Sequence, residues 1–126
     1  MAERDLVAYG RNLLEAEGAF VLKVHGSGMQ IQGIPDCLIS YPIRSLMDPS
    51  KIYGAVFVAI EYKDGTDKHL EPLQDYWTMK IRETGALAAG IHNRGEFDAW
   101  FVQIQLHVEE LGRAMDQAIW LARGDR

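Results

Sequence analysis

The sequence predicts a single α/β domain in which helices flank a central sheet, and three observations carry that prediction. Residues 55–63, AVFVAIEYK, form a nearly continuous apolar run, which is typical of a strand buried on both faces. Segments near both ends of the chain instead repeat their apolar residues at helical spacing. The resulting order is helix, three strands, helix, strand, helix, and this mixture is expected of a sheet packed against helices.

The first helix is expected over residues 4–17, where a mostly apolar stripe recurs at helical spacing. Gly18 follows at the position where a left-handed residue commonly ends a helix. Residues 19–25, AFVLKVH, then predict a strand of aromatic and β-branched residues. Residues 26–33 contain three glycines and no clear period, which indicates a loop.

The middle of the chain predicts two strands and their connection. Residues 35–42 predict the first of them, with Pro35 at its start, where the missing N–H removes no ladder hydrogen bond. Residues 43–54 predict an irregular or hairpin connection. The buried strand over 55–63 follows directly.

The last third of the chain predicts a helix, a short strand and another helix. A helix begins near Glu71-Pro72, with proline at the favoured first position, and stops at Gly85. Residues 87–93 predict a short strand. Residues 97–105 fit either a short helix or a final strand, and the pattern does not decide between them. Residues 107–122 predict a last helix with one apolar face, formed by Val108, Leu111, Met115, Ile119 and Ala122.

Composition fits one compact domain spanning residues 1–126, since 48% of the residues are hydrophobic. The single cysteine, Cys37, excludes an intrachain disulfide and fits a reducing compartment. No stretch approaches the ~20 apolar residues of a membrane-spanning helix. We do not expect the first residues to form a signal peptide, because no long apolar run follows them. We therefore expect a cytoplasmic protein of a bacterial or phage-infected host cell, with no membrane partner.

The candidate chemistry centres on Pro35-Asp36 and Glu61-Tyr62-Lys63. Side chains two apart on a strand share a face, so Glu61 and Lys63 emerge together at the end of the buried strand. Asp36 begins the preceding strand and reaches Glu61 if the two strands are neighbours. Two converging carboxylates repel each other unless a cation lies between them, and Mg²⁺ prefers such oxygen ligands. An E-x-K at a solvated strand end is also common without any function, so the pattern depends on its context.

That context resembles one nuclease family. The motifs GIPDCLI, FVAIEYK, LEPLQDYW and IRETGALAAGI, in this order and spacing, are similar to the VRR-NUC branch of the PD-(D/E)XK nucleases. They are also similar to archaeal-type Holliday-junction resolvases, and the resemblance covers about residues 5–95. It implies a restriction-endonuclease-like fold with a mixed sheet, and hydrolysis of DNA phosphodiester bonds with Mg²⁺ or Mn²⁺. We expect branched DNA to be the favoured substrate.

The resemblance assigns a role to each residue that matches the motifs. Asp36 and Glu61 are expected to be metal ligands, together with the backbone carbonyl of Tyr62. Lys63 is the expected catalytic lysine. Gln74, early in the helix after the core strand, is expected to support the site.

An acid in the first helix often completes such a site. Asp5 is the leading candidate because of its distance from Gly18, and Glu3 and Glu15 are the others. A first-turn acid also serves simply to complement the helix dipole.

Three further residues are candidates for DNA contact. Ser27 falls where junction resolvases carry a glycine-serine loop, and an ordinary flexible turn is the alternative. Arg44 and Lys51 lie in the connection over 43–54, which is longer than in the shortest family members. The alternative is that this segment is only a hairpin extension and makes no contact with DNA. Glu71 departs from the family's usual Ser or Thr and is a poorer helix cap.

Other chemistries are not indicated. The four histidines lack zinc-ligand spacing, and Cys37 inside a strand predicts a buried small hydrophobe. No Walker A or G-x-G-x-x-G motif is present, so we expect no nucleotide cofactor. The tryptophans predict core or interface anchors more than base-stacking platforms, and they are Trp77, Trp100 and Trp120.

Charge and oligomeric state leave alternatives open. A net charge of -5 argues mildly against nucleic-acid binding, although bound metal would offset a carboxylate cluster. The helix over 107–122 either packs on its own sheet or joins a second copy as a homodimer, the form that the resemblance implies. The main alternative functions are an inactive DNA-binding or interaction module, and a nuclease of duplex or flap DNA.

Overall fold

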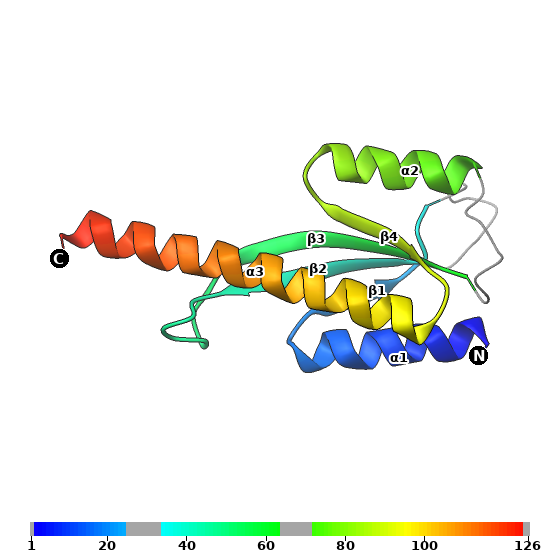
Figure 1. Ribbon diagram of the computed structural model, residues 1–126, viewed down its shortest axis with the longest axis horizontal. Helices are drawn as coiled ribbons and strands as arrows, with labels where there is room; N and C mark the ends of the chain where they lie inside the picture. The colour runs from blue at the N-terminus through cyan, green and yellow to red at the C-terminus, as the bar shows by residue number, and fades with distance from the viewer. Residues whose placement is uncertain (1, 25–33, 64–71, 125–126) are drawn as a thin grey trace.

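The computed structural model describes residues 2–24, 34–63 and 72–124 (Figure 1). In these ranges the elements follow the predicted order: α1 (Glu3–Ala16), β1 (Phe20–Lys23), β2 (Cys37–Arg44), β3 (Ile52–Tyr62), α2 (Pro72–Glu83), β4 (Leu87–Ile91) and α3 (Arg94–Arg123). No helix within these ranges combines the length and the apolar character needed to cross a membrane.

The four described strands form one mixed sheet in the order β1-β2-β3-β4. β1, β2 and β3 are antiparallel neighbours, and β4 joins β3 in parallel. A parallel pair needs a crossover connection, and α2 lies within the one between β3 and β4. The mixed sheet flanked by helices is therefore confirmed.

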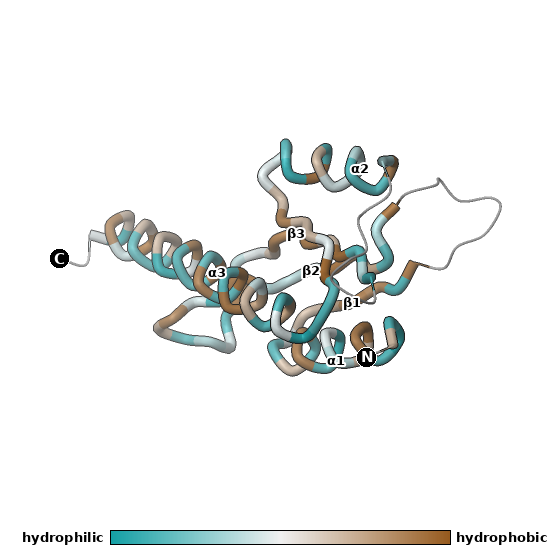
Figure 2. The backbone as a smooth tube through the Cα atoms, turned by 45° about the vertical axis from the view of Figure 1, so that its right-hand side comes forward, coloured by the Kyte–Doolittle hydropathy of each residue, from teal (hydrophilic) through white to brown (hydrophobic). Residues whose placement is uncertain are grey.

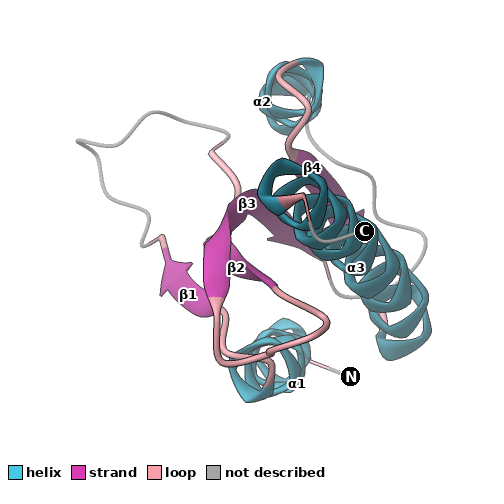
Figure 3. Cartoon of the chain, turned by 90° about the vertical axis from the view of Figure 1, so that its left-hand side faces the viewer, coloured by secondary structure: helices cyan, strands magenta, loops and turns pink. Residues whose placement is uncertain are grey.

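The two faces of the sheet are covered unequally (Figure 3). α1 and α3 lie against one face, and α2 lies against the other beside β4. The core lies between the sheet and the pair α1 and α3, and its largest fully buried side chains include Leu6, Leu14, Ile39, Ile60, Tyr62, Phe97 and Ile104. On the α2 side of the sheet, Phe20 and Phe57 remain 67% and 46% exposed.

β3 is less buried than the sequence predicted. The strand begins at Ile52, and only Val58 to Tyr62 are buried at every position, whereas Ala55 and Phe57 are exposed. The pairing with β4 begins at Val58, so the earlier residues have a strand neighbour on one side only. An apolar run records the hydrophobicity of a strand but not the number of elements that cover it.

α1 ends where the sequence predicted. Gly18 has φ +84°, in the left-handed region that glycine favours. Its N–H donates to the Glu15 carbonyl at 2.9 Å, and the N–H of Ala19 donates to the Leu14 carbonyl at 3.1 Å. This pair of bonds is a Schellman motif, which satisfies the last carbonyls of α1 and turns the chain into β1.

α3 is one continuous helix, so the prediction for the last part of the chain was incomplete. Residues 97–105 are helical rather than a strand, and the helix expected over 107–122 begins at Arg94. Asn93 caps it by accepting the Glu96 N–H at 2.9 Å. The buried residues that set the period are Phe97, Phe101, Ile104, Val108 and Gly112.

The C-terminal part of α3 extends beyond the sheet (Figures 1 and 2). On the predicted apolar face, Val108 is buried and Leu111 is half-buried, whereas Met115 and Ala122 are exposed. The first half of that face therefore packs on the chain's own sheet, and the second half does not.

The connection over 43–54 is a β-hairpin whose strands run further than expected, because β2 continues to Arg44 and β3 begins at Ile52. Asp116 on α3 holds its loop. Its carboxylate accepts the N–H groups of Leu46 at 2.9 Å and Met47 at 3.4 Å, and also the hydroxyl of Tyr53. These hydrogen bonds therefore hold the hairpin loop against the extended part of α3.

Candidate active site

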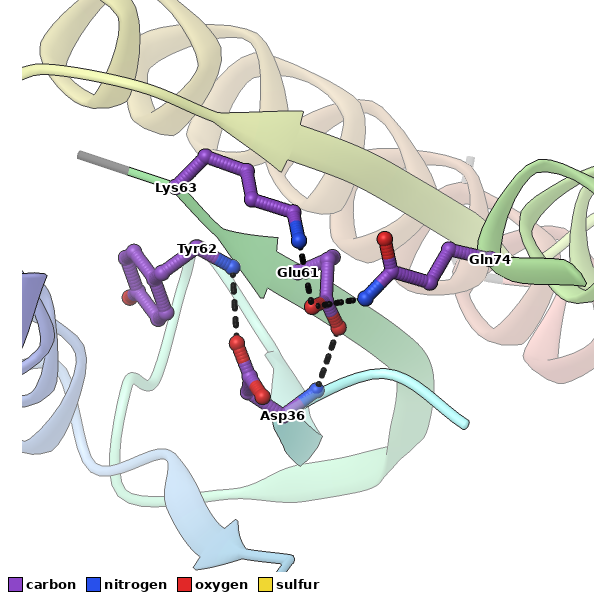
Figure 4. A network of polar contacts seen from close by, with 5 residues as sticks. All are labelled: Asp36, Glu61, Tyr62, Lys63 and Gln74. Atoms are coloured by element: carbon purple, nitrogen blue, oxygen red, sulfur yellow. Dashed lines mark hydrogen bonds and ion pairs between the residues drawn. The ribbon is translucent and has the colours of Figure 1, made fainter. Parts of the chain in front are cut away.

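Asp36 and Glu61 lie opposite each other at one end of the sheet (Figure 4). The β2–β3 register pairs Cys37 with Ile60, and the next position along each strand brings Asp36 beside Glu61. The expectation that these acids come from neighbouring strands is confirmed. The first turns of α1 and α2 lie toward the same end of the domain.

Two hydrogen bonds join the chain at Asp36 to the chain at Glu61, just beyond the Cys37–Ile60 pair of β2 and β3. The N–H of Asp36 donates to Glu61 Oε2 at 3.1 Å, and the N–H of Tyr62 donates to Asp36 Oδ2 at 3.0 Å. Each carboxylate thus accepts a backbone donor from the opposite segment. Hydrogen bonds to ionised acceptors are among the strong ones, so both side chains are positioned by the sheet itself.

Lys63 and Gln74 both approach Glu61. Lys63 Nζ lies 3.9 Å from Glu61 Oε1, and Gln74 Nε2 donates to the same oxygen at 2.5 Å. Gln74 lies in the first turn of α2, and Arg82 anchors the other end of that helix by donating to the Ala88 carbonyl at 2.8 Å. The structure therefore brings together the four residues that the resemblance assigned to the site.

Tyr62 belongs to the core through its side chain and to the candidate site through its backbone. Its side chain is 1% exposed and lies on the α1 face, opposite to Glu61 and Lys63. The N–H of Lys63 bonds to the Ile91 carbonyl on the β4 side, whereas the N–H of Tyr62 bonds on the β2 side. The two backbone groups of one strand residue point to the same side, so the Tyr62 carbonyl lies on the side of Asp36, as the expected ligand role requires.

The carboxyl of Glu61 has a raised pKa. Burial, followed by the negative charge of Asp36, raises the pKa of the Glu61 carboxyl from 4.5 to about 7, while Lys63 acts in the opposite direction. Ionising a buried carboxyl beside another is unfavourable unless a cation compensates. Glu61 therefore takes up its proton at a higher pH than an exposed glutamate does.

The first-helix acids are not placed as the sequence ranked them. Asp5, the leading candidate, lines a surface depression with Tyr9 and Arg94 rather than the site. Glu15 pairs with Arg11 at 2.6 Å on the exposed side of α1. Glu3 is the one whose charge contributes to the raised pKa of Glu61. Helical spacing contained this signal, because Glu3 precedes the buried Leu6 by three residues and shares its face.

The donor set fits a hard divalent cation. Mg²⁺ is usually held by one or two carboxylates, with waters completing its shell, and Asp36, Glu61 and the Tyr62 carbonyl supply oxygen only. Across residues 2–24, 34–63 and 72–124, no three or more His, Cys, Asp or Glu side chains group closely enough to hold a metal ion, so the protein oxygens available at this site are those of two carboxylates and one carbonyl. The raised pKa of Glu61 reflects burial and the nearby charge of Asp36, and a cation held between the two carboxylates would offset both.

The proposed DNA contacts are not brought to the site. Arg44 and Lys51 lie at the other end of the β2–β3 hairpin, roughly 25 Å from Asp36 at ~3.3 Å per residue along β2. Arg44 Nη1 donates to the Pro49 carbonyl at 3.0 Å, and Lys51 lies 5.3 Å from the Tyr53 ring. Ser27 lies outside the described residues.

The remaining sequence expectations have mixed outcomes. Cys37 is buried, and burial raises the pKa of its thiol to about 11, as expected of a small hydrophobe. Trp100 packs edge-on against Phe97 with ring centroids 6.5 Å apart, which is the predicted core role. Trp120 is 43% exposed on the extended part of α3. Glu71 lies outside the described residues.

Comparison with solved structures identifies the fold. The chain is similar to a structure described as a VRR_NUC domain, with a TM-score of 0.60 and 22% sequence identity over 79% of this chain and 92% of that one. No family model matches the sequence, and no curated protein matches it significantly. The resemblance to VRR-NUC domains is therefore confirmed for the fold, which is restriction-endonuclease-like.

Proposed function

We propose that this chain is a nuclease of the VRR-NUC kind that hydrolyses DNA phosphodiester bonds with Mg²⁺ or Mn²⁺. The observation that carries the proposal is the convergence of Asp36, Glu61, Lys63 and Gln74 at one end of the sheet. Function on this fold depends on the site rather than on the fold itself, and these four side chains supply two carboxylates, an ammonium group and an amide, which supports the proposal.

Each side chain has a distinct role in this proposal. Asp36, Glu61 and the Tyr62 carbonyl would hold the cation, and Glu3 is the first-helix acid whose negative charge acts on Glu61. When bound, the cation polarises the phosphoryl oxygen and lowers the pKa of water. Lys63 presents its ammonium beside Glu61, where it stabilises charge on the phosphate being attacked. Gln74 holds Oε1 of Glu61, which leaves the carboxylate with a fixed orientation toward Asp36.

A homodimer and a branched DNA substrate complete the proposal. Two active sites related by a twofold axis cut two strands of a branched molecule symmetrically. The outer side of α3 exposes apolar residues that a second copy would cover, among them Val102 at 51%, Leu106 at 55% and Trp120 at 43% exposed. We expect the dimer in the cytoplasm of a bacterial or phage-infected cell, where its DNA substrate is found. Leu106→Glu is expected to shift the molar mass measured by light scattering from dimer to monomer.

The deciding experiment compares cleavage of labelled four-way junction, flap and linear duplex with Mg²⁺, Mn²⁺ or EDTA. Glu61→Gln and Lys63→Met are the site variants. Glu110→Gln and Lys80→Met make the same chemical changes at exposed positions and serve as controls. We expect metal-dependent nicks that both site variants reduce by at least ~10²-fold and both controls preserve.

The substrate arms separate the alternatives. Paired symmetric nicks in the junction support the resolvase-like reading, whereas preferred cutting of flap or duplex would assign a repair or restriction role. Binding of DNA without cleavage by the wild-type protein, with either metal, would identify a binding module on a nuclease scaffold. Cleavage that persists in Glu61→Gln would show that the site is assigned wrongly.

A further inference from the structure

The sheet face that carries Asp36 and Glu61 continues past these acids as two rows of mostly apolar side chains. Side chains two positions apart on a strand share a face, so this face includes every second residue before Glu61 in β3 and after Asp36 in β2. The register of β1, β2 and β3 makes the nearer row Leu22, Leu38 and Ala59, and the farther row Phe20, Ser40 and Phe57. Phe57 is four residues from Glu61, roughly 13 Å at ~3.3 Å per residue.

This face is covered beside β4 and exposed over β1 and β2. α2 lies over β4 (Figure 3), and Ala59 of β3 is completely buried. Outside that cover, the exposed fractions are 67% for Phe20, 51% for Leu22 and 46% for Phe57. The open face, as we call it, consists of Phe20, Leu22, Leu38, Ser40 and Phe57. Contiguous apolar surface marks an interaction site more often than scattered apolar residues do.

The open face has no charged side chain, although the proposed substrate is a polyanion. The chain carries a net charge of -5, and Arg44 and Lys51 lie at the far end of the hairpin. Contacts between basic side chains and phosphates supply most of the non-specific affinity of DNA-binding proteins. An acidic chain therefore needs a further, uncharged source of affinity for DNA, and the open face lies directly beside Asp36 and Glu61.

The two phenylalanine rings are spaced for unpaired nucleotides. Phe20 and Phe57 flank Ser40 from opposite sides, so they are two strands apart, ~10 Å at ~4.8 Å per strand. That distance corresponds to about three nucleotides at ~3.4 Å each. The bases of a single strand stack on exposed aromatic rings, whereas the bases of a duplex stack on one another. Ser40, a small residue between the rings, offers a hydroxyl to a phosphate or sugar.

We propose that the open face is a stacking platform for unpaired nucleobases, on which Phe20 and Phe57 hold a single strand that leads to Asp36 and Glu61. The substrate then carries single-stranded nucleotides within about four stacked bases of the cleaved bond, since ~13 Å is about four rises of ~3.4 Å. This inference rests on the proposed nuclease function for the chemistry at the two acids, but the binding step does not depend on it.

The test measures binding of the full chain to labelled oligothymidine and to a duplex of the same length, in EDTA so that no metal-dependent cleavage occurs. Fluorescence anisotropy gives both affinities, and we expect the single strand to bind more tightly than the duplex. Photocrosslinking with an oligonucleotide that contains 5-iodouracil, followed by mass spectrometry, is expected to attach the base to Phe20 or Phe57.

Substitutions at Phe57 separate stacking from general apolar contact. Phe57→Ala is expected to weaken single-strand binding by about 5–150-fold, the range for loss of one base–aromatic stack, and Phe20→Ala by a similar factor. Phe57→Leu keeps an apolar side chain without a flat ring and is expected to bind several-fold more weakly than the wild type, whereas Phe57→Trp is expected to retain affinity. Ile52→Ala changes an exposed apolar residue of β3 beyond the open face and is the control expected to leave affinity unchanged.

Salt dependence distinguishes the platform from phosphate contacts. Because a stacked base releases no counterions, the slope of log affinity against log salt concentration is expected to be the same in Phe57→Ala and in the wild type. A shallower slope in Phe57→Ala would show that the substitution had removed phosphate contacts and would count against the platform.

Three other results would overturn the proposal. Unchanged single-strand affinity in both Phe20→Ala and Phe57→Ala would place DNA elsewhere on the protein. Full affinity in Phe57→Leu would show that apolar area rather than a ring is recognised. A lower molar mass of Phe57→Ala in light scattering would show that a second copy of the chain covers the open face. Thermal unfolding of each variant is expected to match the wild type, because both phenylalanines are largely exposed.

The same measurements separate the platform from the nuclease assignment. Single-strand binding through Phe57 without cleavage in Mg²⁺ or Mn²⁺ would support the platform and contradict the nuclease function. Metal-dependent cleavage by a protein whose single-strand affinity depends on neither phenylalanine would do the reverse.

Discussion

The carboxylate of Glu61 accepts the backbone N–H of Asp36 at 3.1 Å, so the position of each acid depends on the other. Glu61 reaches this donor from the end of β3, and Asp36 returns the contact by accepting the N–H of Tyr62 at 3.0 Å. Because the site is built into the strand pairing, its geometry is as rigid as the sheet. The unfavourable ionisation of Glu61 in this site can therefore be measured as a loss of protein stability.

Replacing Glu61 by Gln is expected to stabilise the metal-free protein above neutral pH. The pKa of Glu61 rises from 4.5 in the unfolded chain to about 7 in the fold, mainly through burial. Between these values the folded state binds more protons at Glu61 than the unfolded state. The stabilisation that this group provides is thus complete below pH 4.5 and lost as the pH rises through 7. Glu61→Gln removes that loss.

Thermal unfolding in EDTA at pH 5 and pH 8 measures this effect. The Tm difference between the two conditions is expected to be smaller for Glu61→Gln than for the wild type, and unchanged for Glu110→Gln. Added Mg²⁺ is expected to raise the Tm of the wild type at pH 8 but not that of Glu61→Gln, because ligands that bind only the folded state stabilise it. Identical pH profiles for wild type and Glu61→Gln would contradict the assignment.

Gln74→Ala is expected to reduce cleavage while leaving the fold intact. Gln74 holds Glu61 Oε1 at 2.5 Å from a half-buried position, so little packing is lost with it. Removing a residue that orients a metal ligand typically lowers activity or metal affinity by ~10–100-fold. Single-turnover cleavage across a Mg²⁺ titration measures both the activity and the metal affinity. Asp75→Asn, the exposed neighbour, is the control, and an unshifted titration in Gln74→Ala would argue against a supporting role.

Gly10→Ala is expected to destabilise the protein although alanine is the better helix former. A Cβ at this position would lie 2.7 Å from the Phe97 ring and would also meet the Tyr62 hydroxyl. Overpacking of this kind costs about 1–3 kcal/mol against a ~1 kcal/mol gain in helix propensity, so a net destabilisation of up to about 2 kcal/mol is expected. Urea unfolding measures the difference, with the exposed Asn12→Ala in the same helix as a control expected to be neutral or stabilising. A more stable Gly10→Ala would show that α1 does not pack this closely.

Asp116→Asn is expected to loosen the hairpin loop. It is also expected to make the stability of the protein less dependent on pH in the acid range. Hydrogen bonds from Tyr53 and Ser45, and from the Leu46 and Met47 amides, lower the pKa of Asp116 from 3.8. Its contribution to stability is therefore present above pH 3.8 and lost as the pH falls through the lower, folded-state pKa.

Hydrogen exchange of the Leu46 and Met47 amides reports this directly. Exchange is expected to quicken in Asp116→Asn, which keeps one acceptor oxygen, and more so in Asp116→Ala. Amides elsewhere, such as those of β4, are expected to keep their wild-type rates. Unchanged exchange at both loop amides would mean that the hairpin holds its shape without α3.

Cys37 is expected to resist thiol reagents until the protein unfolds. It is 2% exposed, and burial raises the pKa of its thiol to about 11, so little thiolate is present at pH 8. Labelling with iodoacetamide is expected to follow the rate of global opening and to become immediate in denaturant. Fast labelling of the native protein would show that this end of β2 opens locally.

The sequence by itself determined the order of the elements and the core of the site. Helical and strand periods, together with the boundaries at Gly18 and Pro72, depend on local geometry and were confirmed. The spacing of Glu61 and Lys63 places both on one face of a strand for the same local reason. Only the pairing of Asp36 with Glu61 needed the assumption that their strands are neighbours.

Tertiary structure decided everything that depends on which elements meet. An apolar run could not show that the first half of β3 is mostly exposed, because burial is a property of the assembled domain. For the same reason the sequence did not decide that residues 97–105 belong to α3. The charge of Glu3 acts on Glu61, whereas Asp5 lines a surface depression, because the packing of α1 decides which of its faces meets the sheet. The hydrogen bonds from Leu46 and Tyr53 to Asp116 join residues more than sixty positions apart, and no local pattern records such contacts.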